Sequence, residues 1–143
     1  MRDIHNSIRV LTAIPPKAIG TSGATNGSLS GILDTKGYDS HEFIINHGIV
    51  GATGDTTTPV ILESATTGGT FTSVSNDDLL GTEAAASLPA APRVSGSTQN
   101  FSTKIGYRGT KRFLRIRLFG LGHATGIVSA TLVSTKASRE PVA

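Results

Sequence analysis

The 143-residue chain contains no cysteine and no tryptophan, and its aromatic and charged contents are low, at 5% and 16%. Without cysteine, the chain has no disulfide framework, no thiolate metal site and no cysteine nucleophile. It has no run of about 18 apolar residues, so we expect no membrane-spanning helix. Residues 1–16 mix charges into their apolar positions and lack the continuous apolar core of a secretion signal. We therefore expect the protein to be made in the cytoplasm and kept or assembled there.

The motifs that carry catalysis or cofactor binding are also missing. The sequence contains no HExxH, GxSxG, GxxxxGK[ST] or GxGxxG pattern. His41 and His47 would share one face of a strand but lie about 20 Å apart, too far to hold one metal ion. Asp77 and Asp78 are adjacent, and adjacent side chains on a strand point to opposite faces, so they form no general acid–base pair. We predict no catalytic residue, no metal and no cofactor, and we predict that the chain is not an enzyme.

What the sequence does contain is glycine, serine, threonine and β-branched residues in short alternating segments, which are typical of strands joined by turns. Roughly seven or eight such segments predict an all-β fold, an antiparallel β-sandwich or jelly-roll-like barrel with at most one short helix. The length fits a single domain, residues 1–143. We expect extended arms at residues 1–16 and 136–143, and an exposed loop at 84–99.

The alternation is clearest in the last third of the chain. Residues 101–107 and 111–119 alternate apolar and polar side chains on either side of a short Arg-Gly-Thr turn, which predicts a hairpin. Residues 126–134 alternate in the same way, so we expect a three-stranded meander. On the middle strand, Leu114, Ile116 and Leu118 should face the core and leave Arg115 and Arg117 on the opposite face.

The charge is unevenly distributed along the chain. Residues 1–83 contain nine acids and four bases, whereas residues 84–139 contain nine bases and no acid. This asymmetry favours an electrostatic partner, which could be nucleic acid, an acidic protein surface, or the acidic half of this chain or of a neighbouring copy. Six of the thirteen Lys and Arg residues lie in residues 104–118, next to phenylalanines.

Arginine and aromatic residues on an outward face are enriched at protein interfaces, where lysine is depleted. We therefore predict a protein interface rather than a nucleic-acid site, because the chain has few aromatic side chains for base stacking and a net charge of only +3. The predicted interface residues are Arg108, Lys111, Arg112, Phe113, Arg115, Arg117 and Phe119.

Four stretches of the chain, in this order, carry a family resemblance: MRDIHNSIRVLTAI, TKGYDSHEFIINHGIVGATGD, LESATTGGTFTSVSNDDLLGT and TKIGYRGTKRFLRIRL. The arrangement resembles small capsid-associated virion proteins of tailed bacteriophages, such as decoration (cement) or head-completion proteins. The resemblance covers most of the chain and implies a compact β-domain. It implies as partners the major capsid protein and other copies of the chain, in a trimer, and as location the virion, assembled in the host cytoplasm.

On these grounds we expect a non-enzymatic virion structural protein that binds the outer capsid surface and stabilises the head, guided by Arg112, Arg115 and Arg117. A head–tail joining or tail component is the alternative within this class. Two alternatives come from other classes, a carbohydrate-binding sandwich and a nucleic-acid-binding β-module. The absence of Trp and the presence of only two Tyr residues disfavour the carbohydrate-binding sandwich. The nucleic-acid alternative would use Lys104, Arg108, Lys111, Arg115 and Arg117.

Overall fold

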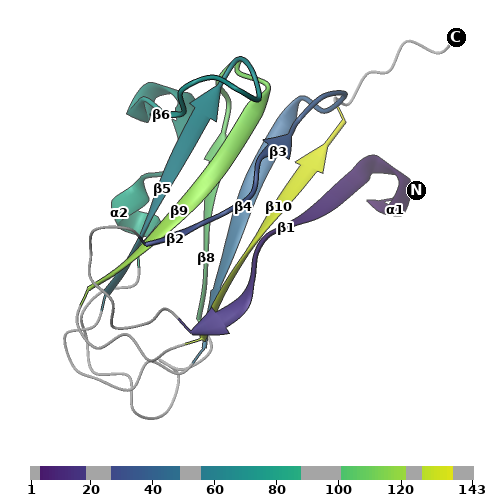
Figure 1. Ribbon diagram of the computed structural model, residues 1–143. Coiled ribbons are helices and arrows are strands. Elements are labelled where there is room, and N and C mark those ends of the chain that lie inside the picture. The colour runs from purple at the N-terminus through teal and green to yellow at the C-terminus, as the bar shows by residue number, and fades with distance from the viewer. Residues whose placement is uncertain (1–3, 19–26, 49–55, 88–100, 122–126, 137–143) are drawn as a thin grey trace, which may run out of the picture.

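The computed structural model describes residues 4–18, 27–48, 56–87, 101–121 and 127–136. In these residues the chain forms a sandwich of two β-sheets with three single helical turns at its margins (Figure 1). Along the chain the elements are α1 Ile4–Ser7, β1 Ile8–Ala18, β2 Ser28–Leu29, β3 Leu33–Asp34, β4 Ser40–His47, β5 Thr56–Ser64, β6 Thr72–Ser73, the 3₁₀ turn η1 Asn76–Asp78, β7 Leu79–Leu80, α2 Glu83–Ala86, β8 Phe101–Tyr107, β9 Phe113–Leu121 and β10 Ile127–Thr135.

The strand order is that of a jelly roll. The first sheet, which we call the β4 sheet, has the order β1-β10-β4-β8-β7, and the second, the β9 sheet, has the order β2-β9-β5-β6 with β3 also paired to β9. All of these pairs are antiparallel. β1 pairs with β10, β2 and β3 with β9, β4 with β8, and β5 with β6, as in one long hairpin rolled onto itself. The predicted fold class is therefore confirmed.

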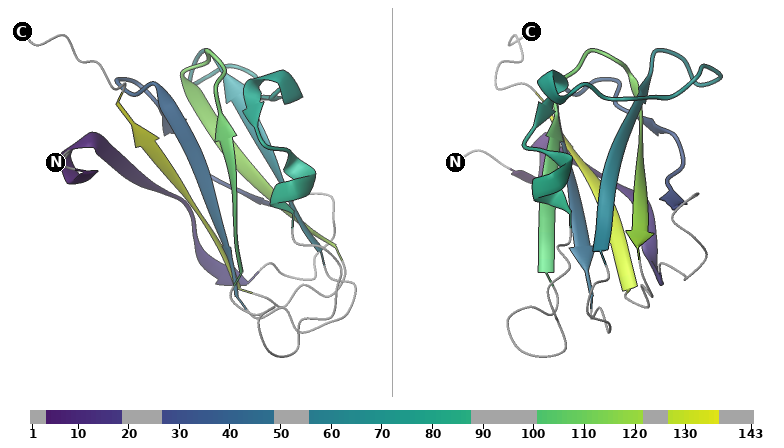
Figure 2. Two further views of the ribbon diagram at one scale, coloured as in Figure 1. Left: turned by 180° about the vertical axis from the view of Figure 1, so that it is seen from behind. Right: turned by 90° about the vertical axis from the view of Figure 1, so that its left-hand side faces the viewer.

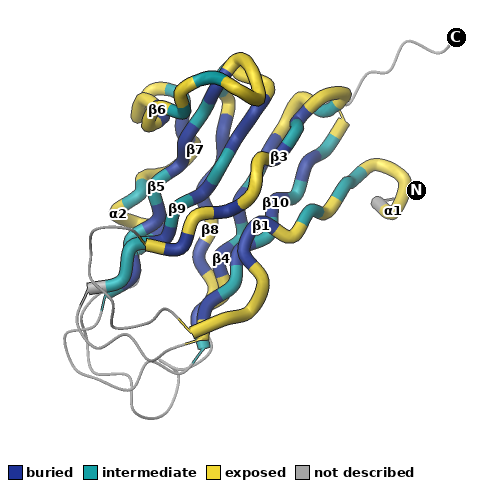
Figure 3. Tube along the Cα trace, viewed as in Figure 1, coloured by how far each residue is buried: buried dark blue, intermediate teal, exposed yellow. Residues whose placement is uncertain are grey.

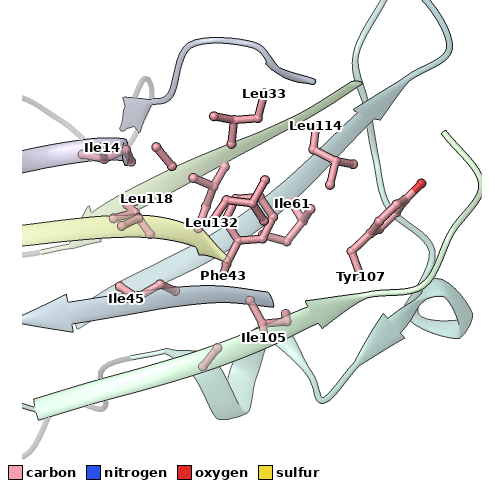
Figure 4. Packing of buried hydrophobic residues seen from close by; sticks show 14 of the residues in the cluster. Ile14, Leu33, Phe43, Ile45, Ile61, Ile105, Tyr107, Leu114, Leu118 and Leu132 are labelled. Atoms are coloured by element: carbon pink, nitrogen blue, oxygen red, sulfur yellow. The ribbon is translucent and has the colours of Figure 1, made fainter. Parts of the chain in front are cut away.

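Period-two alternation sorts the side chains between core and surface, because successive residues of a strand point to opposite faces. Figure 3 shows buried and less buried positions alternating along the long strands. On β9 the side chains of Leu114, Ile116 and Leu118 are fully buried, as predicted, and Phe43 and Ile45 of β4 meet them from the other sheet (Figure 4). The core is thus one apolar layer between the sheets, as expected for a sandwich.

The predicted hairpin and meander are wrong. β8 belongs to the β4 sheet, where it pairs with β4 and β7, and β9 belongs to the β9 sheet, where it pairs with β5. The connection between them therefore crosses from one sheet to the other, and β10 returns to lie between β1 and β4. Alternation reports which side chains face the core, but it carries no information on which strand is the hydrogen-bonded neighbour.

The predicted N-terminal arm is wrong over most of its length. Residues 8–16 lie in β1, an edge strand that pairs with β10 from Ile8 to Ala18 with two register shifts. The shift after Ile14 contains Pro15 and Pro16, which have no N–H for the ladder and which an edge strand tolerates. Most of the predicted C-terminal arm, residues 137–143, lies outside the described residues.

The exposed loop expected at residues 84–99 begins instead in a helical turn. α2 is capped by Thr82, whose side chain accepts a hydrogen bond from the Ala85 N–H, and Ala86 is fully buried. The Ile61 N–H donates to Glu83, and Thr103 donates to the Ala86 carbonyl, so α2 closes the side of the sandwich between β5 and β8 (Figure 2). Residues 88–99 of the predicted loop lie outside the described residues.

The helical content also exceeds the single short helix that we expected. α1, η1 and α2 are each one turn, and η1 and α2 have serine and threonine N-caps that the strand pattern does not report. No helix in the described part of the chain has the length and apolarity needed to cross a bilayer.

Candidate functional site

The outer face of the β9 sheet carries four of the seven predicted interface residues. Phe113, Arg115, Arg117 and Phe119 alternate with the three buried aliphatic residues of β9, so all four lie on the face of the strand opposite the core. Phe113 is nevertheless buried, with an exposed fraction of 8%, so it is not the exposed interface residue that we predicted. Arg115 is paired in register with Leu62 of β5, and Arg117 with Val60. The structure thus brings these residues together on one face, with both arginines partly exposed.

Each of these guanidinium groups lies over an aromatic ring. The Arg115 guanidinium carbon is 5.3 Å from the centroid of Phe71, and that of Arg117 is 5.5 Å from the centroid of Phe119. Arg112 lies over Phe113 in the same way, at 4.8 Å. Cation–π contacts of this kind are worth about 0.5–1 kcal/mol at exposed sites, so they restrict where the charged groups lie.

Of the predicted interface cations, Arg112 is paired with an acid and Arg108 with a backbone carbonyl. Arg112 forms a bidentate ion pair with Asp34, with Nε to Oδ1 at 2.8 Å and Nη2 to Oδ2 at 2.7 Å. This pairing holds the pKa of the Asp34 carboxyl far below its usual range. Arg108 donates from Nε to the Asp77 carbonyl at 2.8 Å. The charge of Arg112 is therefore balanced within the chain, although we predicted that it would guide binding.

Arg115 and Arg117 form no ion pair of this kind with an acid among the described residues. Arg115 donates from Nε to the Ser30 carbonyl at 3.1 Å, a neutral acceptor. Arg117 Nε is buried and has no hydrogen-bond partner in the described part of the chain. The β9 sheet therefore presents two neighbouring guanidinium groups that no acid of the described ranges balances.

Sequence reasoning missed the aliphatic and aromatic side chains that complete this surface. Leu29 of β2 is paired in register with Arg117 and is 36% exposed, and Ile32 on the same edge is 42% exposed. These residues lie in or beside strands of two residues, too short for a period-two signal. We call the surface the Arg–Phe face and define it by Leu29, Val60, Phe71, Arg115, Arg117 and Phe119. Leu62 and Phe113 lie on the same side of the sheet but are buried.

The remaining predicted cations lie elsewhere. Lys111 lies in the connection between β8 and β9, beside a depression of about 360 Å³ that Lys36 and Tyr38 also line. Lys104 is exposed on β8, in the β4 sheet. The nucleic-acid alternative required Lys104 to act with Arg115 and Arg117, and the structure separates them onto two different sheets.

The two strand histidines share the inner face of β4, as predicted, and both are buried. His41 Nδ1 lies 3.0 Å from Ser134 Oγ, and His47 Nε2 lies 3.3 Å from Thr103 Oγ1. Each ring therefore bonds a hydroxyl of a neighbouring strand. In the residues that the structure describes, no group of three or more His, Asp or Glu side chains is placed to hold a metal ion.

The burial of His41 predicts acid sensitivity. Burial, reinforced by the nearby positive charge of Arg9, lowers the pKa of His41 below 6.5. Below pH 6.5 the unfolded chain therefore binds a proton that the folded chain resists, so the free energy of unfolding should fall as the pH drops. The fall should be at most about 1.4 kcal/mol per pH unit. Chemical denaturation between pH 7.5 and 5 measures it.

The control for this prediction is Ser134→Ala, which removes the hydroxyl partner but keeps the titrating ring. Ser134→Ala should lower the stability at all pH values and keep the slope between pH 6.5 and 5. His41→Gln should flatten the slope. An unchanged slope in His41→Gln would assign the acid sensitivity to other groups.

Comparison with known proteins gives a fold and no family. No family model and no curated protein matches the sequence. One similar solved structure is that of the amino-terminal CBM22-1 and GH10 modules of endo-1,4-β-D-xylanase 10B from Clostridium thermocellum, in complex with xylohexaose. The similarity has a TM-score of 0.52 at 12% sequence identity and covers 96% of this chain. This chain spans 28% of the length of that structure. Because the two sequences are only 12% identical, the similarity shows the β-sandwich fold alone.

Proposed function

We propose that this chain is a non-enzymatic structural protein of a tailed-bacteriophage virion, a decoration protein that binds the outer capsid surface and stabilises the head. The observation that carries the proposal is the Arg–Phe face, where two arginines lie among phenylalanines and aliphatic side chains and pair with no acid in the part of the chain that the structure describes. Arginine and aromatic residues are the types enriched at protein interfaces. The resemblance of the sequence to capsid-associated proteins supplies the class of partner, the major capsid protein.

The sandwich supports this role mechanically. Two sheets locked by a shared core hold the outer face of β9 in a fixed shape, so binding costs little ordering of the interface. Each exposed ion pair contributes only about 0–1 kcal/mol, so stabilisation of a shell must come from contact area repeated by symmetry. We include contacts with other copies, in a trimer, in the proposal. A position at the head–tail joint or in the tail is the alternative within this class.

A second candidate function is carbohydrate binding, and one observation favours it. The xylanase structure of similar fold was solved with xylohexaose. In this chain Phe101 is 43% exposed beside a depression of about 230 Å³ that Asn46 and Ser102 also line. Titration with xylohexaose tests this function, and binding that Phe101→Ala removes would favour it over the capsid. We rank it second because the chain has no Trp and two Tyr for sugar stacking.

The decisive experiment for the capsid role is co-sedimentation with shells assembled from the major capsid protein of the phage that encodes this chain. The wild-type protein should pellet with the shells and raise the temperature at which they rupture. Arg115→Glu combined with Arg117→Glu should abolish both effects, because two attractive contacts become repulsive.

The matched control is Lys17→Glu combined with Lys104→Glu, which makes the same change of charge on the β4 sheet and should leave shell occupancy unchanged. Equal occupancy by the Arg115 and Arg117 double variant would remove the Arg–Phe face from the interface. Failure of the wild-type protein to pellet would overturn the decoration role. Electron microscopy of the bound particle then separates the capsid surface from the head–tail joint.

A further inference from the structure

We infer that the Arg–Phe face binds an extended acidic protein segment in which carboxylates occupy every second residue, one for Arg115 and one for Arg117. This inference rests on the proposed function, because it takes that face to be the interface, and it adds the chemistry of the partner.

The spacing comes from the strand. Arg115 and Arg117 are two residues apart on β9, so their Cα atoms lie about 6.8 Å apart and their side chains share one face. An extended partner segment repeats side chains on one face with this same period. Carboxylates at alternate positions therefore match both guanidinium groups at once, and each planar guanidinium can donate two parallel hydrogen bonds to one carboxylate.

The guanidinium groups are already restrained before a partner arrives. Phe71 and the Ser30 carbonyl hold Arg115, and Phe119 holds Arg117. Arg117 Nε is buried, so it has lost contact with water, and it has no hydrogen-bond acceptor among the described residues. An incoming carboxylate would supply the missing negative charge. Because both side chains are largely in position, little rotamer entropy is lost on binding.

The same geometry disfavours nucleic acid. Single strands are bound through bases stacked on open aromatic faces. Here the Phe71 and Phe119 rings are covered on one side by guanidinium groups. The positions in register with Arg117 are the aliphatic Leu29 and Val60, which would shield an ion pair from water.

A second copy of this chain does not supply such a segment. The ten acids of the sequence include no two that are separated by one residue, and Asp77 and Asp78 are adjacent. The occupant we infer is therefore a different protein. Under the proposed function it is an exposed acidic strand or arm of the capsid subunit.

The test uses the folded chain and four probes. These are a peptide of alternating threonine and glutamate, an isomer of the same composition with its glutamates adjacent, a glutamine version of the alternating peptide, and oligothymidylate. Amide chemical shifts report the affinity and the position of each probe. We expect the alternating peptide to shift resonances of β9 and β2, to bind several-fold more tightly than its isomer, and to weaken as salt rises.

Three double variants identify the residues that contact the peptide. Arg115→Gln combined with Arg117→Gln should lower the affinity for the alternating peptide by about tenfold. Lys17→Gln combined with Lys104→Gln, which removes two charges from the other sheet, should bind like wild type. Arg115→Lys combined with Arg117→Lys should lose much of the preference for alternating glutamates, because lysine keeps the charge without the bidentate fork.

Three results would overturn the inference. Equal binding of the two isomers would show that the spacing of the carboxylates does not determine the affinity. Tighter binding of oligothymidylate through the same arginines would make nucleic acid the ligand. Binding of no peptide, while capsid co-sedimentation still depends on Arg115 and Arg117, would refute the alternating-carboxylate partner and leave the decoration role standing. Peptide binding without co-sedimentation would refute the decoration role alone.

Discussion

Replacing Phe43 by alanine should lower the free energy of unfolding by about 3–5 kcal/mol. Phe43 is fully buried on β4, the strand between β10 and β8, and its ring lies at the centre of the apolar layer that joins the sheets (Figure 4). Removing the ring loses its transfer free energy and leaves a cavity that β-sheets on both sides cannot easily fill. Chemical denaturation of the purified variant measures the loss.

Phe101→Ala is the matched control, because the same truncation is made on β8 at a side chain that is 43% exposed. It should cost less than about 1 kcal/mol. If Phe43→Ala is too unstable to purify, Phe43→Leu keeps most of the volume and should cost about 1.5 kcal/mol or less. Equal losses at Phe43 and Phe101 would show that Phe43 does not occupy the core that joins the sheets.

Tyr107→Phe should lower the free energy of unfolding by about 1–3 kcal/mol, because it deletes one hydroxyl that makes two hydrogen bonds. The hydroxyl donates to Glu63 Oε2 at 2.6 Å and accepts from the Lys111 N–H at 2.9 Å. It thereby joins the end of β8 to β5 and to the connection that crosses between the sheets. Thermal or chemical unfolding at pH 7 measures the cost.

The residues around this hydroxyl are tightly packed, so we expect them not to rearrange when the hydroxyl is removed. Gly109 sits against the tyrosine, and a Cβ at that position would lie 2.5 Å from the Tyr107 hydroxyl oxygen. Burial and the hydrogen bond to Glu63 raise the pKa of Tyr107 well above 10. The folded chain therefore holds the phenolic proton more tightly than the unfolded chain does, and the wild-type protein should lose stability as the pH rises above about 10.

Tyr107→Phe should lack this alkaline contribution, since it has no phenol to titrate. The control is Tyr38→Phe, which keeps the ring that lies 4.4 Å from the Arg9 guanidinium carbon and should change stability by less than about 0.5 kcal/mol. A Tyr107→Phe variant as stable as wild type at pH 7 would show that the crossover does not depend on this hydroxyl.

Part of the candidate face could be predicted from the sequence. Alternation along β9 predicted that Arg115 and Arg117 would lie opposite Leu114, Ile116 and Leu118, and burial confirms it. The hydrogen-bond acceptors of Arg112 and Arg108 could not be predicted. Asp34 is far from Arg112 in the sequence, and the Asp77 carbonyl that binds Arg108 is a backbone atom with no side-chain signature.

Of the two aromatic residues that contact Arg115 and Arg117, one could be predicted from the sequence and the other could not. Phe119 lies next to Arg117 on the same face of one strand, so a sequence pattern can suggest the pair. Phe71 reaches Arg115 from the segment before β6, and only the fold brings them together. Leu29 likewise joins the face through the pairing of a two-residue strand with β9.

By itself the sequence determined the class of the fold and the inward or outward direction of each long strand, because period-two alternation follows from the geometry of extended backbone. Only the tertiary structure decided which strands are neighbours, that the segment after Tyr107 changes sheets, and that residues 8–16 form an edge strand instead of an arm. It also decided that Asp34 pairs with Arg112. Strand neighbours and ion pairs depend on contacts between residues far apart in the chain, and no local pattern encodes them.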